Sequence, residues 1–354
     1  MKIFYAVQAT GNGHISRATE IVPALQQYGE VDVFLSGSNY SLKTNLPIAY
    51  RSKGLSLVYN KKKGAIDIVK TLKNLSIRKI WNEAKFLPVE KYDLVINDFE
   101  SITSLACQIK KVKSIHLGHQ ASFSSKNVPR PDKKDYLAEW ILQHYARGSR
   151  NLGFHFKEYD ENIYNPIIRK NILNADPKDK GHITIYLGQY DSTKIIECIQ
   201  TINDFRFEIF CRDAKEININ ENYKILPVSQ ELFTNSMINC HGIITGAGFE
   251  TPAEALYLNK RLMVIPLKGQ YEQLCNAAAL KEFNVTVIDE LCQNFKSPFE
   301  KWIEINEQTP LTLTKSTNEI ICEIIEGKKA PSIENLLSEW SIPYHIPHQR
   351  VVSN

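Results

Sequence analysis

A glycine turn between an apolar run and a helix-like segment carries the residue types and spacing that best fit ligand chemistry. The apolar run at 243–245 ends in Gly246-Ala-Gly248, and Thr251 and Pro252 then open a segment with apolar residues at helical spacing. Glycine lets the backbone approach a ligand closely, and the free N–H groups at a helix N-terminus favour negative charge. The turn therefore predicts a phosphate site.

Polar side chains near this turn extend the predicted site. Glu254 lies one turn inside the helix-like segment, too deep to cap it, and its carboxylate can accept two hydroxyl hydrogen bonds from a sugar. A second polar cluster at 268–276 follows the next apolar run, and open α/β sheets bind ligands at the carboxyl ends of neighbouring strands. Together these features predict a nucleotide-sugar site. For the turn alone, the alternative is a tight structural connection.

The elements that would position these residues alternate between strand and helix. Helical patterns include 65–86, 101–110 and 133–147. Short apolar strands are expected at 2–9, 31–36, 55–59, 93–97, 113–117, 151–156, 182–187, 205–210, 224–227, 242–245, 261–267 and 285–288. This alternation predicts an α/β protein with parallel sheets that helices cover on both faces.

The length of the chain predicts two domains. A single hydrophobic core stops growing below the 354 residues present here. We expect one α/β domain over 1–156 and a second over 181–330. Residues 157–180 are polar and contain two prolines, which is typical of an interdomain linker. Residues 331–354 are expected to be helix-like and then irregular.

Charge is distributed unevenly along the chain. Residues 1–150 hold 23 Lys and Arg against 12 Asp and Glu, whereas the remainder holds 20 against 27. The basic first half could meet an anionic membrane surface or an acidic acceptor, and the alternative is an ordinary solvated lysine-rich surface. Nucleic acid is not expected, because the basic run at 61–63 is short and no recognition module is present.

The amino-terminal run leads directly into a strand pattern without a small-residue cleavage site, so no signal peptide is expected. No apolar run approaches the roughly 20 residues that span a bilayer. The expected location is the cytoplasm, with peripheral contact at the inner face of the membrane as a hypothesis.

The segment from Gly248 to Glu254, with Pro266 and the run from Gln270 to Asn276 behind it, resembles the donor-nucleotide signature of GT-B glycosyltransferases. The sequence looks most like the lipid-acceptor N-acetylglucosaminyltransferases of bacterial cell-wall synthesis (family 28) and the UDP-dependent glycosyltransferases of secondary metabolism. The resemblance implies two Rossmann-like parallel-sheet domains that face each other across a cleft. It also implies that the first domain binds the acceptor, that the second binds the donor, and that residues 331–354 pack back on the first.

On the acceptor side, a second glycine turn leads into His14. In the secondary-metabolism relatives this histidine deprotonates the acceptor hydroxyl, and Asp98 matches the position of its partner aspartate. Histidine suits a base because its ordinary pKa of about 6.5 leaves one ring nitrogen free near neutral pH. The alternatives are that His14 only positions the turn and that Asp98 caps the helix at 101–110. The acceptor-site candidates are Gly11, Asn12, Gly13, His119 and Gln120.

On the donor side, the resemblance assigns roles by position. Gly246, Gly248 and Thr251 would approach the phosphates, Glu254 the ribose, and Val228 the nucleobase. Gly188 and Gln189 would meet the diphosphate from the opposite side. Gln270 is a donor-binding candidate that lies in the polar cluster, and Glu272 and Gln273 of this cluster would reach the transferred sugar. Two residues depart from the pattern. Glu272 stands where Gln or Asp is usual, and Glu250 stands beside the phosphates, where a carboxylate would repel them unless it is turned away.

The resemblance and the residue pattern together predict an inverting, metal-independent glycosyltransferase. No metal and no cofactor are expected, because neither an Asp-x-Asp pair nor a cluster with metal-ligand spacing is present. Helix-terminal amides would instead stabilise the departing diphosphate. The acceptor would be a hydroxyl, with a lipid-linked or cell-envelope precursor as a hypothesis. The remaining alternatives are a non-hydrolysing UDP-sugar 2-epimerase and a non-catalytic nucleotide- or glycan-binding protein. An NAD-dependent oxidoreductase fits less well, since a third glycine and an acidic residue after the second strand are missing.

Overall fold

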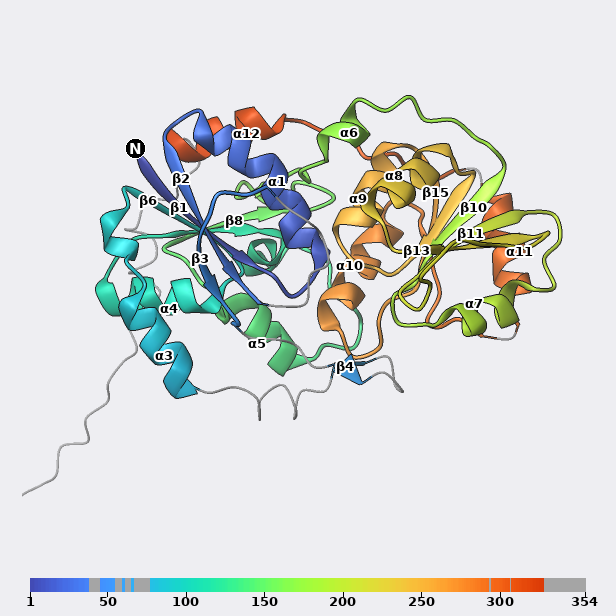
Figure 1. Cartoon of the computed structure of the whole chain (residues 1–354), viewed down its shortest axis with the longest axis horizontal. Coiled ribbons are helices and arrows are strands. Elements are labelled where there is room, and N and C mark those ends of the chain that lie inside the picture. The colour runs from blue at the N-terminus through green and yellow to red at the C-terminus, as the bar shows by residue number, and fades with distance from the viewer. Residues whose placement is uncertain are drawn as a thin grey trace, which may run out of the picture.

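Two seven-stranded sheets, each flanked by helices, lie side by side in the molecule (Figure 1). The computed structural model describes residues 1–37, 45–54, 59–60, 65–66, 77–292, 294–305 and 307–327. Strands of the first sheet end at residue 164, and strands of the second run from residue 182 to residue 287. The α/β class predicted from the alternating pattern is therefore confirmed.

The first sheet has the order β3-β2-β1-β6-β7-β8-β9, and all neighbouring strands are parallel. Strand β1 is buried from Ile3 to Gln8 because it lies in the middle, with both faces covered. Val7 of β1 pairs with Asp98 of β6, so Asp98 ends its strand beside the turn that follows β1. The strands are β1 (Lys2–Gln8), β2 (Glu30–Ser36), β3 (Ile48–Ser52), β6 (Leu94–Asp98), β7 (Ile115–Gly118), β8 (Arg150–Phe154) and β9 (Ile163–Tyr164).

Amphipathic helices cover this sheet. Helix α1 (Asn12–Gln26) buries Ile15, Ala18, Ile21 and Leu25, which recur at three- and four-residue spacing on one face. Helix α4 (Ser101–Lys110) begins at Ser101 because the Glu100 carboxylate accepts hydrogen bonds from the backbone N–H groups of Ile102 and Thr103. The other helical elements are α3 (Ile77–Phe86), η1 (Val89–Lys91), η2 (His119–Ser124) and α5 (Tyr136–His144).

The second sheet repeats the plan in the order β12-β13-β11-β10-β14-β15-β16. Only the edge pair β12 and β13 is antiparallel among its described strands. The strands are β10 (His182–Tyr186), β11 (Arg206–Cys211), β12 (Asn218–Ile219), β13 (Tyr223–Pro227), β14 (Gly242–Thr245), β15 (Arg261–Val264) and β16 (Thr286–Val287). The helices are α7 (Ser192–Ile199), α8 (Gln230–Asn239), α9 (Glu250–Tyr257), α10 (Tyr271–Lys281) and α11 (Lys296–Glu304).

Several local predictions need correction. Within the helix predicted over 65–86, the structure shows α3 (Ile77–Phe86), but Ala65–Ile66 (β5) pairs antiparallel with Tyr59–Asn60 (β4) and is not helical; residues 67–76 lie outside the described residues. Strand β3 was not predicted, since its side chains are partly exposed and give no apolar run. The strand predicted at 55–59 falls mostly outside the described residues.

The chain returns to the first half through its last described helix. Helix α12 (Thr317–Ile325) lies beside α1 (Figure 1), and its Ile320, Ile321 and Ile324 are buried there. Ser316 and Glu319 form a capping box that fixes where α12 begins. The tail expected at 331–354 lies outside the described residues, and the expected domain boundaries stay predictions. The segment 157–180 also contains β9 and a short helix, α6 (Lys170–Leu173). Within the described ranges, no helix has the length and apolar character to cross a membrane.

Candidate functional site

His14 and Asp98 lie in contact at the carboxyl end of the first sheet. His14 is in the first turn of α1, and Asp98 ends β6 on the neighbouring strand. The Nδ1 atom of His14 lies 2.9 Å from Oδ1 of Asp98. Because Glu100 caps α4, the alternative that Asp98 serves as that cap is wrong. The two residues predicted to act as a pair are therefore adjacent in the structure.

Arg17 is the residue that sequence reasoning missed in this site. It lies one turn after His14 on the same face of α1, and it is buried. Its Nε donates to Oδ2 of Asp98 at 3.1 Å, and its Nη2 donates to Oδ1 at 2.8 Å. Burial alone would raise the pKa of Asp98, but Arg17 and His14 outweigh it and hold that pKa well below its ordinary range. The three-residue spacing from His14 was the sequence signal that could have revealed Arg17.

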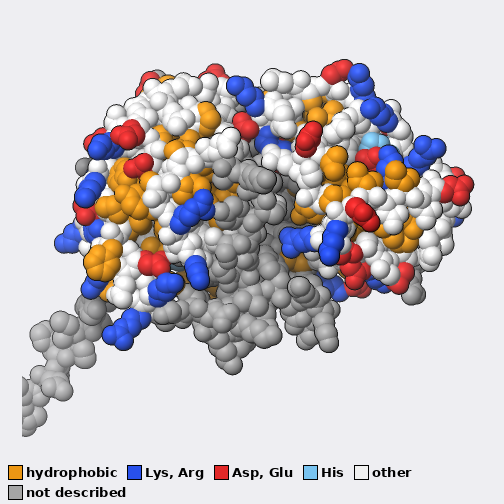
Figure 2. Space-filling model, viewed as in Figure 1, with side chains coloured by type: hydrophobic (Ala, Val, Ile, Leu, Met, Phe, Trp, Pro, Cys, Tyr) orange, Lys and Arg blue, Asp and Glu red, His pale blue; other side chains and the backbone are white. Residues whose placement is uncertain are grey.

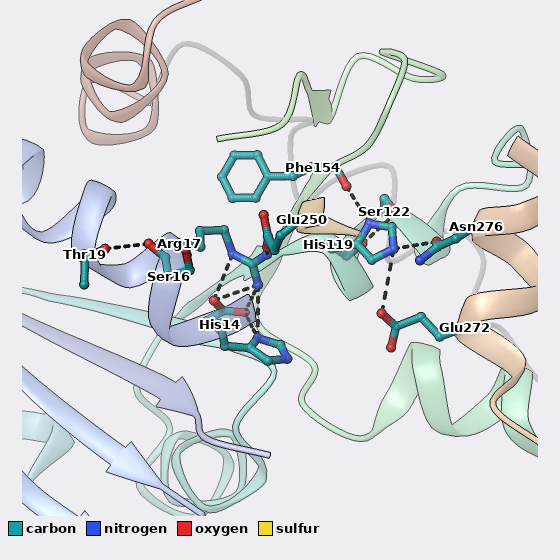
Figure 3. A network of polar contacts seen from close by, with 11 residues as sticks. His14, Ser16, Arg17, Thr19, His119, Ser122, Phe154, Glu250, Glu272 and Asn276 are labelled. Carbon is teal, nitrogen blue, oxygen red and sulfur yellow. Dashed lines mark hydrogen bonds and ion pairs between the residues drawn. The ribbon is translucent and has the colours of Figure 1, made fainter. Parts of the chain in front are cut away.

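Glu250 joins this cluster from the other half of the chain. It begins α9, and its Oε1 accepts a hydrogen bond from Nη1 of Arg17 (Figure 3). Gly13 allows this close approach, because a Cβ there would lie 3.1 Å from Cγ of Glu250. Burial raises the pKa of Glu250 to about 7, although Arg17 opposes the rise. The carboxylate that departs from the family pattern is thus turned toward Arg17.

His119 forms a second bridge between the halves. Its Nδ1 lies 2.9 Å from the Phe154 carbonyl oxygen, and its Nε2 lies 2.8 Å from Oδ1 of Asn276 on α10 (Figure 3). Its ring stacks on Phe249 at a centroid distance of 3.9 Å. Glu272 is 3.9 Å from the same Nε2. Burial lowers the pKa of His119, although Glu272 opposes the shift. Predicted as an acceptor residue, His119 lies buried between the domains.

Glu254 is held by an arginine. Arg169 donates to both carboxylate oxygens at 2.6 Å, and both side chains are largely buried. Nη1 of Arg169 also donates to Thr234 on α8. The expected ribose ligand is therefore already part of a bidentate ion pair. This ion pair could not be predicted from the sequence, because Arg169 lies in the predicted linker.

The other donor candidates lie around the carboxyl ends of the second sheet. A Cβ added to Gly246 would lie 3.5 Å from Oε1 of Gln273. That oxygen accepts a hydrogen bond from the backbone N–H of Leu267. Gln189 donates to the Ile265 carbonyl oxygen at 3.2 Å. The remaining candidates are Gly188 after β10, Val228 after β13, Gly248 before α9, Thr251 in its first turn, and Gln270 at the start of α10.

The other acceptor candidates lie at the two turns of the first half. Gly11 precedes α1 and Asn12 begins it, and a Cβ added to Gly11 would meet nothing within 4 Å. Gln120 is buried, and its Oε1 has no hydrogen-bond partner in the described part of the chain. Across the same described residues, no group of three His, Cys, Asp or Glu side chains could hold a metal ion.

Comparison with known proteins places this geometry in a family context. Residues 1–297 match the family model described as Glycosyl transferase family 1. A search of curated proteins finds no significant match.

Solved structures share the whole fold at low sequence identity. Arabidopsis thaliana UGT89C1 in complex with UDP is 12% identical, with a TM-score of 0.55, over 96% of this chain and 98% of that one. The spinosyn forosaminyltransferase SpnP is 13% identical, with a TM-score of 0.54 and the same coverage of both chains. The glycosyltransferase SnogD from Streptomyces nogalater is 12% identical, with a TM-score of 0.52, over 92% of this chain and 99% of that one. These likenesses confirm the expected GT-B fold.

Proposed function

The chain belongs to glycosyl transferase family 1 and is a glycosyltransferase, and we propose that it moves a sugar from a UDP-sugar to a hydroxyl acceptor with inversion. The observation that carries the proposal is the contact of His14 with Asp98, 2.9 Å apart at the carboxyl end of the first sheet. The network they form with Arg17 reaches the glycine turn of the second sheet through Glu250. A base at this place can meet a donor held by that turn.

In the proposed reaction, His14 removes the proton from the acceptor hydroxyl. Asp98 accepts the Nδ1–H hydrogen bond, which leaves Nε2 free to take the proton and stabilises the imidazolium that forms. The acceptor oxygen forms a bond to the anomeric carbon while the bond from that carbon to the diphosphate breaks. Because this is a single displacement, the anomeric configuration inverts.

The proposed donor site uses the glycine turn and the start of α9. Backbone N–H groups near Gly248 and Thr251 would stabilise the charge on the departing diphosphate without a metal ion. Arg169 would fix the orientation of Glu254, whose oxygens each keep a second lone pair for the ribose hydroxyls. Gln270, Glu272 and Gln273 would reach the transferred sugar, and Val228 would lie against the base.

Donor binding can be tested by thermal shift with UDP, GDP, TDP, CMP, UDP-sugars and NAD. A ligand at a hundred times its Kd adds about 2.7 kcal/mol of stability, which should raise Tm by roughly 3–4 °C in a protein of 354 residues. We expect uridine nucleotides to give this shift in the wild type and a smaller one in Glu254→Gln. The glutamine keeps the side-chain shape but loses the charge that holds Arg169.

Two outcomes would count against the donor assignment. Stabilisation by NAD alone, or by no nucleotide, would mean that the glycine turns are only structural connections. Release of UDP from a UDP-sugar without any acceptor would favour the 2-epimerase over a transferase. Glu300→Gln is a suitable control, because Glu300 forms an exposed ion pair with Lys296 within α11.

We further propose that the acceptor is lipid-linked and is met at an anionic membrane surface, with the enzyme at the cytoplasmic face. The first 150 residues carry an excess of 11 positive charges. Helix α5 exposes Tyr136, Leu137, Trp140 and Ile141 at helical spacing, a composition that favours contact with an interface. On the face shown in Figure 2, Lys and Arg side chains are interspersed with Asp and Glu over both halves. The apolar side chains of α5 therefore carry this proposal more than charge alone.

Sedimentation with vesicles that contain an anionic phospholipid tests the membrane proposal. We expect binding at low salt, loss of most binding at high salt, and weaker binding for Trp140→Ser, since aromatic side chains favour the interface. Trp81→Ser on α3 is the matched control, because Trp81 is also exposed but lies on a different helix. No binding of the wild type at low salt would refute the proposal.

A further inference from the structure

Four charged or titratable side chains form one network at the contact between α1 and α9. We call His14, Arg17, Asp98 and Glu250 the Arg17 network. Three of them come from the first half of the chain, and Glu250 alone comes from the second. Arg17 is 2% exposed and Asp98 is fully buried, so neither can exchange its partner for water. The arrangement of this network is therefore set by its own members.

His14 Nδ1 has two neighbours that require opposite tautomers. Oδ1 of Asp98 can only accept, so the 2.9 Å contact requires a proton on Nδ1. Nη2 of Arg17 can only donate, so its 3.0 Å contact would require a lone pair on Nδ1 and would put the ring proton on Nε2. Only the first tautomer leaves Nε2 able to accept a proton from a hydroxyl.

The two carboxylates decide where the Arg17 guanidinium lies. Asp98 accepts hydrogen bonds from Nε and Nη2, and Glu250 accepts one from Nη1 on the side that faces α9. We propose that Glu250 is a positioning residue: by holding Nη1 of Arg17 toward α9, it keeps the Nη2 protons directed at Asp98 and not at His14 Nδ1, so that Nε2 stays the proton acceptor. The inference rests on the proposed function, in which His14 is the base.

This assignment couples the two halves of the enzyme. Glu250 is in the first turn of α9, beside the glycine turn where the donor diphosphate would bind. The base takes its working tautomer only while α9 lies against α1 and Glu250 reaches Arg17. Acceptor activation therefore depends on the position of the donor-binding helix, and a hydroxyl is activated only where a donor can be held.

Ionised Glu250 is required for this role, and burial raises its pKa to about 7. The value of kcat should then fall as pH drops through about 7, since protonation removes the charge of Glu250. The titratable and charged groups that face Glu250 are Arg17, His14, Asp98, Glu254, Tyr5 and Arg169.

The test compares kcat against pH for wild type, Glu250→Gln and Glu250→Ala. We expect Glu250→Ala to lower kcat at least about tenfold, since a wrong histidine tautomer can cost up to about 10⁴. Glu250→Gln should lose less, because its amide oxygen still accepts from Arg17. The fall in kcat as pH drops through about 7 should be weaker in both variants than in the wild type, because the Glu250 carboxyl group is absent from them. Nitrogen NMR should show His14 Nε2 unprotonated in the wild type and protonated in Glu250→Ala.

The matched control is Glu282→Gln, which breaks the exposed ion pair of Glu282 with Lys157 across the same two halves. It should leave kcat, its pH dependence and the His14 tautomer unchanged. Wild-type kcat with a wild-type pH dependence in Glu250→Ala would overturn the inference, as would an unchanged tautomer. If the wild type transfers no sugar from any UDP-sugar, the proposed function fails instead, and the tautomer comparison still tests Glu250.

Discussion

Replacing His14 with alanine should lower kcat by about 10²–10⁴-fold, the usual contribution of a positioned general base. The acceptor hydroxyl would then have to lose its proton to water, while the donor site on the second sheet stays intact. The measurement is release of UDP from a UDP-sugar in the presence of acceptor, with kcat and KM determined separately. We expect the loss in kcat, since His14 acts on the reacting oxygen and contributes little to ground-state binding.

Binding of UDP serves as the control for this variant. The thermal shift with UDP should be unchanged in His14→Ala, because the residues proposed to hold UDP lie on the second sheet and its helices. Asp98→Asn is a poorer probe, since it also removes the main partner of Arg17. A near-normal kcat in His14→Ala would mean that His14 is not the base and only positions the turn.

The contrast between His14 and Arg17 shows what the sequence can predict. His14 and Asp98 stand at ends of apolar strands, and parallel strands bring such ends together, so their proximity could be predicted. Arg17 lies within a helix that the sequence also predicts, but a charged residue there is ordinarily solvent-exposed. Only the partners that the fold brings from β6 and α9 explain why it is buried.

On the donor side, the surroundings of Glu254 likewise could not be predicted from the sequence. Its place one turn inside a helix could be predicted, but its pairing with Arg169 depends on the path of the chain between the two sheets. The segment 157–180 between the sheets is polar and was predicted to be a linker, although it includes strand β9 at the edge of the first sheet. Long-range pairing of charges within a polar segment has no periodic signal.

Replacing Arg17 with methionine should lower the free energy of unfolding by about 3–5 kcal/mol near pH 8, the usual cost of leaving a buried charge without its partner. Asp98 would lose its three hydrogen bonds from Nε and Nη2 of the guanidinium, and Glu250 would lose its bond from Nη1. Chemical denaturation at several pH values measures the effect. The pKa of Asp98 is held below its ordinary value, so its contribution to stability is present above about pH 4 and is lost as pH falls further.

The difference in the free energy of unfolding between wild type and Arg17→Met should therefore become smaller as pH falls. Without the cation, burial raises the pKa of both carboxyl groups, so the variant takes up protons at a higher pH than the wild type and loses its unpaired charges. The double variant Arg17→Met with Asp98→Asn should be more stable near pH 8 than Arg17→Met alone, because it removes the more deeply buried charge. If the difference in the free energy of unfolding were the same at every pH, Arg17 would stabilise the protein through packing and not through its charge. Its packing includes the Phe154 ring, whose centroid lies 5.9 Å from Cζ of Arg17.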